Sequence, residues 1–332
     1  MEQLTGLGKT IVATDPDKIK LDMAVKNILA YKPILARIFK EVVSECRDMT
    51  YDEIEDCIEG EVYVSEVYVD SGLTNAGERI DGLSTEAYLN EEGLDRFDVR
   101  TFLRVPGKDE SEPIKLFINV EAQNDDKPGY DIVLRALFYC CRMISAQQGV
   151  EFTTDTDDPV KYGNIKKVYS IWICTETAQK RANSIEKYSI GREFLIGSNP
   201  DIPRYDILTA VLINISKTHD HEGTESELIR LLTDLFDERL NAGERIERLQ
   251  NEHGVRLIRS VEAEVTGMCS YAIAMENKGI EIGIQQGLKA LVASLHDFIP
   301  EFDALYATVI KNEEYANVSR DEVMKYYTEV VG

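Results

Sequence analysis

Two polar side chains close a strongly apolar stretch in the middle of the sequence. Residues 114–123 read IKLFINVEAQ, a run typical of a buried β-strand, and the run ends in Glu121 and Gln123. Side chains two positions apart on a strand point to the same face, so this strand presents a carboxylate and an amide side by side. Burying a charge is costly unless a partner compensates it. The stretch therefore marks a candidate site for chemistry.

A second carboxylate is expected directly opposite the first. Residues 97–105 (FDVRTFLRV) form another β-rich run, and the segment PGKDESEP between the two runs has the composition of a turn. If the hairpin closes symmetrically, the numbers of facing residues sum to 219 and Asp98 faces Glu121, where like charges destabilise the pair. A divalent cation between the two carboxylates would remove that cost, and Mg²⁺ suits such oxygen ligands. Alternatively, both are ordinary strand-end residues, because a one-residue bulge would separate them.

The elements that precede this hairpin are expected to be helical and then extended. Residues 22–47 carry apolar side chains at helical spacing, with a break near Pro33. A helix capped by Thr50 follows, and residues 61–69 alternate like a strand. Residues 71–96, rich in Gly and acidic side chains, are expected to form a long loop.

The elements after the hairpin predict an α/β fold with a helical end. Residues 131–149 are apolar on most sides, which favours a helix buried against something large. Residues 168–174 (VYSIWIC) suit an interior strand of a parallel sheet, and 205–216 add another strand. We therefore expect one domain over residues 1–216 and a helical C-terminal region over residues 217–332.

Three glycines recur every four residues in the C-terminal region. Gly279, Gly283 and Gly287 each cost a helix about 1 kcal/mol. They favour either a flexible joint between helices or a smooth face on which helices associate. The second interpretation would make the C-terminal helices a route to a homo-oligomer.

The composition is that of a globular protein with a strong negative charge. The 332 residues are 43% hydrophobic and 29% charged, with a formal net charge of -23. Such acidity argues against a nucleic-acid partner, because DNA affinity usually comes from basic surface. From Lys161 to Arg192, however, seven basic residues stand against two acidic ones. A polyanion such as DNA would therefore meet the middle of the chain.

The sequence lacks the features of an exported or membrane protein. No apolar run reaches the roughly 20 residues that span a bilayer, and the first residues lack the layout of a signal peptide. The six cysteines include no CxxC pair, which favours reduced thiols. We expect a cytoplasmic protein with no membrane partner.

The central block of the sequence resembles a family of nucleases. Asp98, a turn and then NVEAQ resemble the D…(D/E)-x-K motif of the PD-(D/E)XK nucleases. The resemblance is strongest to the PD-(D/E)XK nuclease family transposases, or recombination-promoting nucleases, whose second strand carries E-x-Q. It covers most of residues 25–290. The other matching stretches are CIEGEVYV, NEEGLDRFDVRTF, NVEAQNDDKPGYDIVLRALFYCCRMISAQ, IKKVYSIWIC and KGIEIGIQQG.

The resemblance implies a restriction-endonuclease-like αβββαβ core with a mixed sheet. In such a core Asp98 and Glu121 would hold Mg²⁺, and the protein would hydrolyse DNA phosphodiester bonds. The metal would lower the pKa of a bound water and stabilise charge on the phosphate. Gln123 stands where the wider PD-(D/E)XK superfamily has a Lys, and an amide can orient water but cannot act as a base at neutral pH. This departure leaves open a slower enzyme, another residue in the base role, or loss of catalysis.

Further residues are candidates for the same site. The superfamily often adds a Glu from the first helix, where Glu41 and Glu45 lie one turn apart, and Glu92, six residues before Asp98, is another candidate. Each of the three can also be read as a solvated surface carboxylate. Basic residues near the predicted helix at 131–149 and the strand at 168–174 are candidates for contacts with the DNA backbone or the carboxylates. They are Arg135, Arg142, Lys166, Lys167, Lys180 and Arg181.

Two functions remain open on the sequence. The first is a Mg²⁺-dependent DNA endonuclease, which the pairing of Asp98 with Glu121 favours. The second is a catalytically weak or inactive DNA-binding or assembly protein on a nuclease scaffold, which Gln123 and the overall acidity favour.

Overall fold

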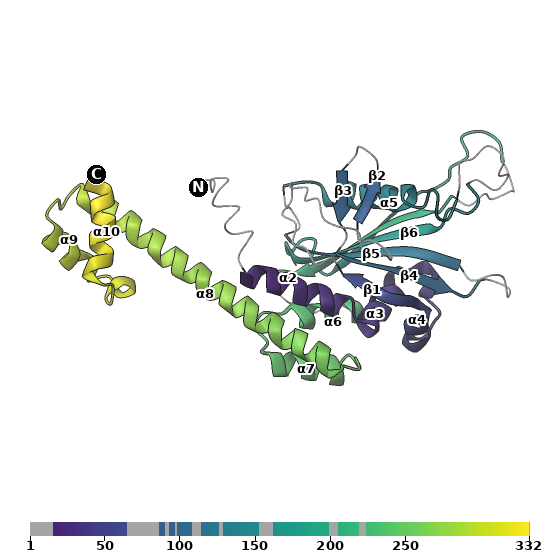
Figure 1. Ribbon diagram of the computed structural model, residues 1–332, viewed down its shortest axis with the longest axis horizontal. Coiled ribbons are helices and arrows are strands. Elements are labelled where there is room, and N and C mark those ends of the chain that lie inside the picture. The colour runs from purple at the N-terminus through teal and green to yellow at the C-terminus, as the bar shows by residue number, and fades with distance from the viewer. Residues whose placement is uncertain are drawn as a thin grey trace. The chain divides into compact units, whose positions relative to one another are not determined.

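The computed structural model describes residues 16–64, 86–89, 93–96, 98–107, 114–125, 129–152, 162–198, 205–218 and 224–331. The chain divides into two compact units, Met1–Cys269 and Ser270–Gly332 (Figure 1). Within the described part of the chain, none of the helices is both long enough and apolar enough to cross a bilayer.

A six-stranded mixed sheet forms the middle of the first unit. Its spatial order is β1-β4-β5-β6-β8-β7. Strands β1, β4 and β5 pair antiparallel, β6 and β8 continue the sheet parallel to β5, and β7 pairs antiparallel with β8 at the far edge. The strands are β1 (Ile58–Val64), β4 (Val99–Val105), β5 (Ile114–Asp125), β6 (Lys167–Thr177), β7 (Ser184–Ser189) and β8 (Leu208–Ser216).

Part of the expected loop at residues 71–96 is a small β-hairpin instead. Strands β2 (Glu86–Leu89) and β3 (Gly93–Arg96) pair antiparallel in a sheet of their own. The sequence did not predict this hairpin, because each strand has only four residues and neither shows a clear alternation of apolar and polar side chains. The acidic, glycine-rich composition around them is typical of a loop.

Helices cover both faces of the six-stranded sheet (Figure 1). On one face lie α2 (Pro16–Leu29), α3 (Lys32–Val42) and α6 (Glu227–Phe236), and on the other lies α5 (Ile132–Ser145). The expected break near Pro33 is confirmed: Pro33 stands in the first turn of α3, where its missing N–H costs nothing. Thr50 caps α4 (Tyr51–Cys57) through a capping box with Glu53.

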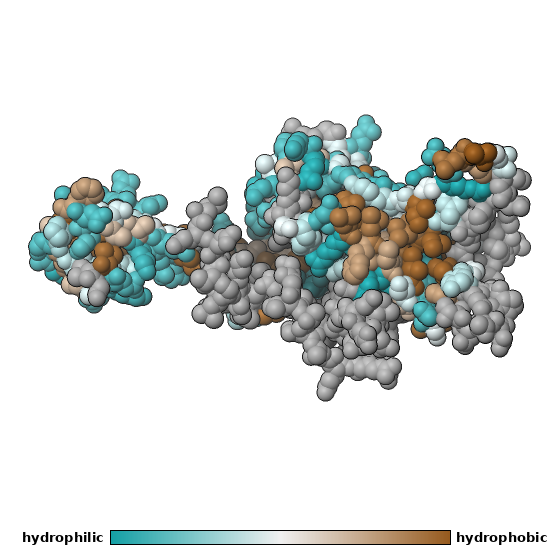
Figure 2. Space-filling model, turned by 90° about the horizontal axis from the view of Figure 1, so that it is seen from above, coloured by the Kyte–Doolittle hydropathy of each residue, from teal (hydrophilic) through white to brown (hydrophobic). Residues whose placement is uncertain are grey.

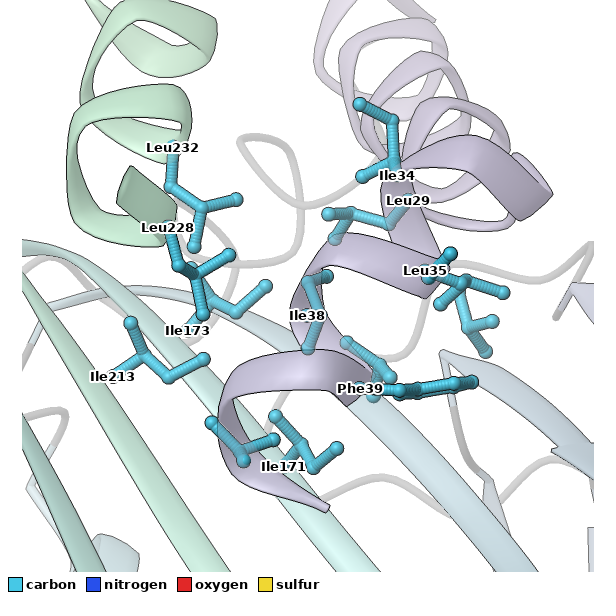
Figure 3. Close-up of a cluster of buried hydrophobic side chains, with 14 of the residues drawn as sticks. Leu29, Ile34, Leu35, Ile38, Phe39, Ile171, Ile173, Ile213, Leu228 and Leu232 are labelled. Carbon is cyan, nitrogen blue, oxygen red and sulfur yellow. The ribbon is translucent and has the colours of Figure 1, made fainter. Parts of the chain in front are cut away.

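The pleat of the strands separates two hydrophobic cores. On β5, Ile118 and Val120 point toward α2, α3 and α6, whereas Phe117 points toward α5. Figure 3 shows the larger core, in which side chains from α2, α3 and α6 meet the isoleucines of β6 and β8. Burying each such side chain stabilises the fold by about 1.5–3 kcal/mol. These cores fix the sheet on which the candidate site is built.

Helix α5 packs against the sheet, as expected, but only one of its faces is buried. Ala136 and Cys140 are buried against the sheet, but Leu134 is 65% exposed and Phe138 is 51% exposed. Figure 2 views this side of the unit and shows hydrophobic residues gathered there. The apolar residues that the sequence shows on most sides of this helix therefore include some on its outer, exposed face.

The boundary between the two units lies later than the expected division after Ser216. Helices α6 and α7 (Ala242–Asn251) belong to the first unit, because Leu228, Leu232 and Leu249 are buried in its main core. The first part of α8 (Arg259–His296) joins them through Val265. The prediction of helices after residue 217 is confirmed. The first of these helices nevertheless pack into the core of the first unit, and this packing decides where that unit ends.

The second unit is a small helical assembly with its own core. It contains the end of α8, α9 (Phe302–Val309), a 3₁₀ turn at Glu313–Tyr315 and α10 (Arg320–Val331). One continuous helix runs through all three glycines, so they form no joint between helices. Association of two copies through these helices stays a prediction.

Gly287 and Gly283 offer a matched pair of substitutions in α8. A Cβ on Gly287 would lie 2.5 Å from the hydroxyl oxygen of Tyr315, whereas a Cβ on Gly283 would meet nothing within 4 Å. We expect Gly287→Ala to destabilise the second unit by about 1–3 kcal/mol, because the buried Tyr315 ring must move. Gly283→Ala should instead stabilise the helix by up to about 1 kcal/mol. Thermal unfolding of the full chain measures both, and equal shifts for the two variants would contradict this packing.

Candidate active site

The β4–β5 hairpin has the register that the sequence predicted. Val99 faces Val120 and Val105 faces Ile114, so facing numbers sum to 219 with no bulge between them. Asp98 directly precedes β4, and its backbone N–H donates to Oε1 of Glu121 at 3.1 Å. In return, the backbone N–H of Ala122 donates to Oδ2 of Asp98 at 3.2 Å. The structure thus brings Asp98 and Glu121 together at the end of two adjacent antiparallel strands.

Glu121 is a buried acid. Its residue is only 5% exposed, and its Oε1 also accepts a hydrogen bond from the side-chain amide of the buried Asn119 at 3.0 Å. Burial, and then the nearby charge of Asp98, raise the pKa of Glu121 well above its ordinary value, although Arg135 acts in the opposite direction. A cation beside Glu121 would favour its charged form.

Asp98 already has a cationic neighbour that sequence reasoning missed. The ammonium of Lys26, on α2, lies 3.1 Å from Oδ1 of Asp98 and 2.7 Å from Oδ2 of Asp22. Burial acts to lower the pKa of Lys26, but Asp98 and Asp22 outweigh it and hold that pKa above the ordinary value. The four-residue spacing of Asp22 and Lys26 was visible in the sequence. The contact with Asp98 depends on how α2 packs against the sheet.

Gln123 is held by a chain of hydrogen bonds from the start of α5. The hydroxyl of Tyr130 donates to Oε1 of Gln123 at 3.0 Å, and the guanidinium of Arg135 donates to the oxygen of Tyr130 and, at 2.9 Å, to that of Tyr139. Because Tyr130 engages the carbonyl side of the amide, the NH₂ group of Gln123 can serve, as far as the described residues show, as a donor to a ligand. Gln123 is thus placed as a donor of hydrogen bonds rather than as an acceptor of protons.

Of the candidates for an added glutamate, Glu41 and Glu45 do not join this site. Glu45 lies in the 3₁₀ turn Ser44–Cys46, where its carboxylate accepts hydrogen bonds from Lys167 at 2.9 Å and from Tyr169 at 2.6 Å. Glu41 lines a cavity between α3 and α6. Glu92 lies outside the described residues. The carboxylate that α2 does bring near Asp98 is Asp22, through Lys26.

The basic candidates lie at different ends of the sheet. Strands β5 and β6 run parallel, and Glu121 lies beside Trp172. Lys166 precedes Trp172 by six residues, so it lies about 20 Å from Glu121 along the strand direction, toward the start of β6. Lys167 is buried and bonded to Glu45 and Asp206, so its ammonium is engaged in the fold. Of the basic candidates on and beside β6, Lys180 and Arg181 follow its carboxyl end, which is the end that carries Glu121.

The two arginines of α5 also differ. Arg135 stands in the first turn of the helix, next to Gln123 and Glu121 through the contacts above. Arg142 lies two turns later, about 10 Å further along the helix. It is 3% exposed, with its guanidinium 5.9 Å from the ring centre of Phe138. The site therefore includes Arg135, whereas Arg142 belongs to the packing of α5.

This geometry predicts which lysine would contact DNA, the partner expected from the sequence. We expect Lys180→Glu to weaken binding to all DNA sequences alike, by roughly three- to tenfold near 100 mM salt, and to reduce the salt slope of log K by about 1. Lys166→Glu is the matched control, because it makes the same charge change at the opposite end of the strand. Fluorescence anisotropy over a salt series measures both. A larger loss for Lys166→Glu would place the DNA surface at the other end of the sheet.

The donors at this site suit a cation that needs few protein ligands. Over the described ranges, no three His, Cys, Asp or Glu side chains gather as a metal cluster. Mg²⁺ is nevertheless commonly held by one or two carboxylates together with waters and substrate phosphates. A buried acid with a raised pKa beside a second carboxylate fits that pattern, and Asp98 and Glu121 are the two residues that could hold such an ion.

Comparison with known proteins adds no assignment. No protein-family model, curated protein or solved structure matches the chain. The interpretation of the site therefore depends on its geometry and on the motif resemblance.

Proposed function

We propose that the protein is a Mg²⁺-dependent DNA endonuclease of the PD-(D/E)XK transposase or recombination-promoting type. The observation that carries the proposal is the pair of hydrogen bonds that ties the carboxylates of Asp98 and Glu121 to the backbone of each other's strand, from the N–H of Ala122 to Asp98 and from the N–H of Asp98 to Glu121. Each residue receives a hydrogen bond from the backbone of the other strand, at the end of an antiparallel hairpin in register. Two carboxylates fixed in this way are suited to share one divalent cation.

The order of the elements supports the same proposal. Helices α2 and α3 are followed by the antiparallel strands β1, β4 and β5, then by α5 and the parallel strand β6. With α4 (Tyr51–Cys57) standing between α3 and β1, this order supports the αβββαβ core that the motif resemblance implies. The β2–β3 hairpin is an addition between the first two strands of that order.

The residues of the site would divide the work of phosphodiester hydrolysis. Asp98 and Glu121 would hold Mg²⁺, which when bound supplies Lewis-acid activation of water and stabilises charge on the phosphate. Gln123, oriented by Tyr130, would donate its NH₂ group to a phosphate oxygen or to the attacking water. Arg135 fixes Tyr130 and adds positive charge near Glu121. Lys180 would bind the DNA backbone.

One observation favours the alternative of a DNA-binding scaffold without catalysis. Lys26 already compensates the charge of Asp98, so the carboxylate pair persists without a divalent ion. In that case the site would be a structural ion-pair network, and DNA binding would need no metal.

Metal-dependent nicking of supercoiled plasmid tests the proposal. Wild-type protein should nick DNA in Mg²⁺ and stop in EDTA, and the Asp98→Ala, Glu121→Ala double variant should lose the activity at every Mg²⁺ concentration. DNA binding by the double variant serves as the control for folding. Equal nicking by the two proteins would reject the assignment of these residues, and binding without nicking by wild type would favour the scaffold.

A further inference from the structure

Lys26 is placed between two carboxylates and away from solvent. Its side chain is 4% exposed, and its ammonium contacts Oδ1 of Asp98 and Oδ2 of Asp22 at 3.1 and 2.7 Å. It reaches Asp98 from α2, on the face of the sheet opposite to α5. Because the ammonium is buried between these carboxylates, it is poorly placed to contact DNA directly.

The partners of Asp98 leave a divalent ion only limited access to its carboxylate. Oδ2 accepts the backbone N–H of Ala122, and Oδ1 is paired with Lys26. The hydrogen bonds that Glu121 accepts from Asp98 and Asn119 both end on Oε1. A cation that binds Asp98 must therefore share an oxygen that already has a partner, and at Oδ1 it competes with the ammonium of Lys26.

We propose that Lys26 is a built-in counter-ion of the carboxylate site, which competes with a divalent cation for Asp98 and thereby weakens the affinity of the site for that cation. The inference rests on the proposed metal-dependent function and adds what sets the affinity of the carboxylate site for the cation. In the cation-free protein, Lys26 keeps Asp98 in place across from Glu121. When a divalent cation binds, the ammonium retains Asp22 as its partner, so its charge does not become isolated.

Direct measurement of cation binding tests this role without any cleavage assay. Isothermal titration calorimetry with Ca²⁺ and with Mg²⁺, at constant ionic strength, would compare wild type, Lys26→Met and Lys26→Arg. Removing a positive charge within contact distance of the same carboxylate should make Lys26→Met bind about tenfold more tightly or better. Lys26→Arg keeps the charge and should stay within about threefold of wild type.

The possible outcomes separate this inference from the proposed function. If wild type binds the cation and Lys26→Met binds no more tightly, Lys26 is not a competitor, while the metal site stands. If no protein binds either cation, the metal site itself is rejected and this inference with it.

A measurement on unmodified protein covers the case in which Lys26→Met fails to fold. The ammonium of a buried, ion-paired lysine gives a ¹⁵N–¹H signal in NMR spectra, which can be assigned to Lys26 by its absence from Lys26→Arg. We expect this signal to shift as Mg²⁺ is added, with the midpoint that calorimetry gives for wild type. A signal that stays unchanged at saturating Mg²⁺ would overturn the competition.

Discussion

Glu121→Gln is expected to abolish DNA cleavage and at the same time to make the protein more stable. The substitution removes one of the two proposed cation ligands, for which we expect a loss of cleavage of about 10³-fold or more. It also replaces a buried acid by a neutral amide whose oxygen can still accept from the N–H of Asp98 and the amide of Asn119. Because the variant no longer buries an ionisable carboxyl group, its free energy of unfolding should be higher than that of wild type by roughly 1 kcal/mol.

Asp98→Asn is the matched control, with the opposite effect on stability. It removes the other proposed ligand, so cleavage should fall just as far. It also leaves the buried ammonium of Lys26 with Asp22 alone, which should cost about 1–3 kcal/mol of stability. Single-turnover cleavage and chemical denaturation measure the two properties. Equal stability changes in the two variants would contradict the different environments assigned to these carboxylates.

The raised pKa of Glu121 also sets the sign of a pH dependence. The folded state holds a proton on Glu121 at pH values where the unfolded chain, with a pKa of about 4.3, has released it. The stability that this proton provides is fully present below about pH 4.3 and is lost as the pH rises to the raised pKa. The stability advantage of Glu121→Gln over wild type should therefore grow with pH, and affinity for Mg²⁺ in wild type should grow with it.

Gln123→Ala is expected to reduce cleavage by roughly 10²-fold, on the order of one positioned polar group in catalysis. The variant removes the amide whose Oε1 accepts the hydrogen bond from Tyr130 and whose NH₂ group is the proposed donor. Gln123→Lys should keep the activity or raise it, because an ammonium can stabilise the phosphate charge in place of the amide. Both variants should still require Mg²⁺.

Tyr130→Phe tests how much of the effect of Gln123 on cleavage depends on the orientation of its amide. It keeps Gln123 but removes the hydroxyl that fixes Oε1, so the loss of cleavage should be smaller than for Gln123→Ala. The measurement is single-turnover cleavage of one DNA substrate at fixed salt. If Gln123→Ala cleaves as fast as wild type, the amide has no catalytic role and another group must act on the water or phosphate.

The parts of the fold that depend on local chemistry could be predicted from the sequence. Pro33 ends one helix and starts the next, and Thr50 caps a helix through Glu53. The register of the β4–β5 hairpin followed from two apolar runs and a turn, since strand alternation leaves few ways to close it. That register was enough to place Asp98 beside Glu121.

The parts that depend on packing between distant segments could not be predicted. Lys26 meets Asp98 only because α2 lies across the sheet, and no spacing in the sequence records that contact. Likewise, Lys167 read as a basic residue at a strand start, but the fold brings Glu45 to it from more than a hundred residues away. In both cases the sequence shows that the residue is a positively charged lysine, but it does not show which carboxylate the lysine pairs with.

A Mn²⁺-soaked crystal, measured for anomalous scattering at the manganese edge, tests the central claim most directly. The account predicts one anomalous peak within about 2.0–2.3 Å of a carboxylate oxygen of both Asp98 and Glu121, with the ammonium of Lys26 moved from Oδ1 of Asp98 toward Asp22. The same crystal of the Asp98→Ala, Glu121→Ala variant should lose the peak. A wild-type crystal with no peak at these carboxylates, and with Lys26 still seated on Asp98 at saturating Mn²⁺, would contradict the account.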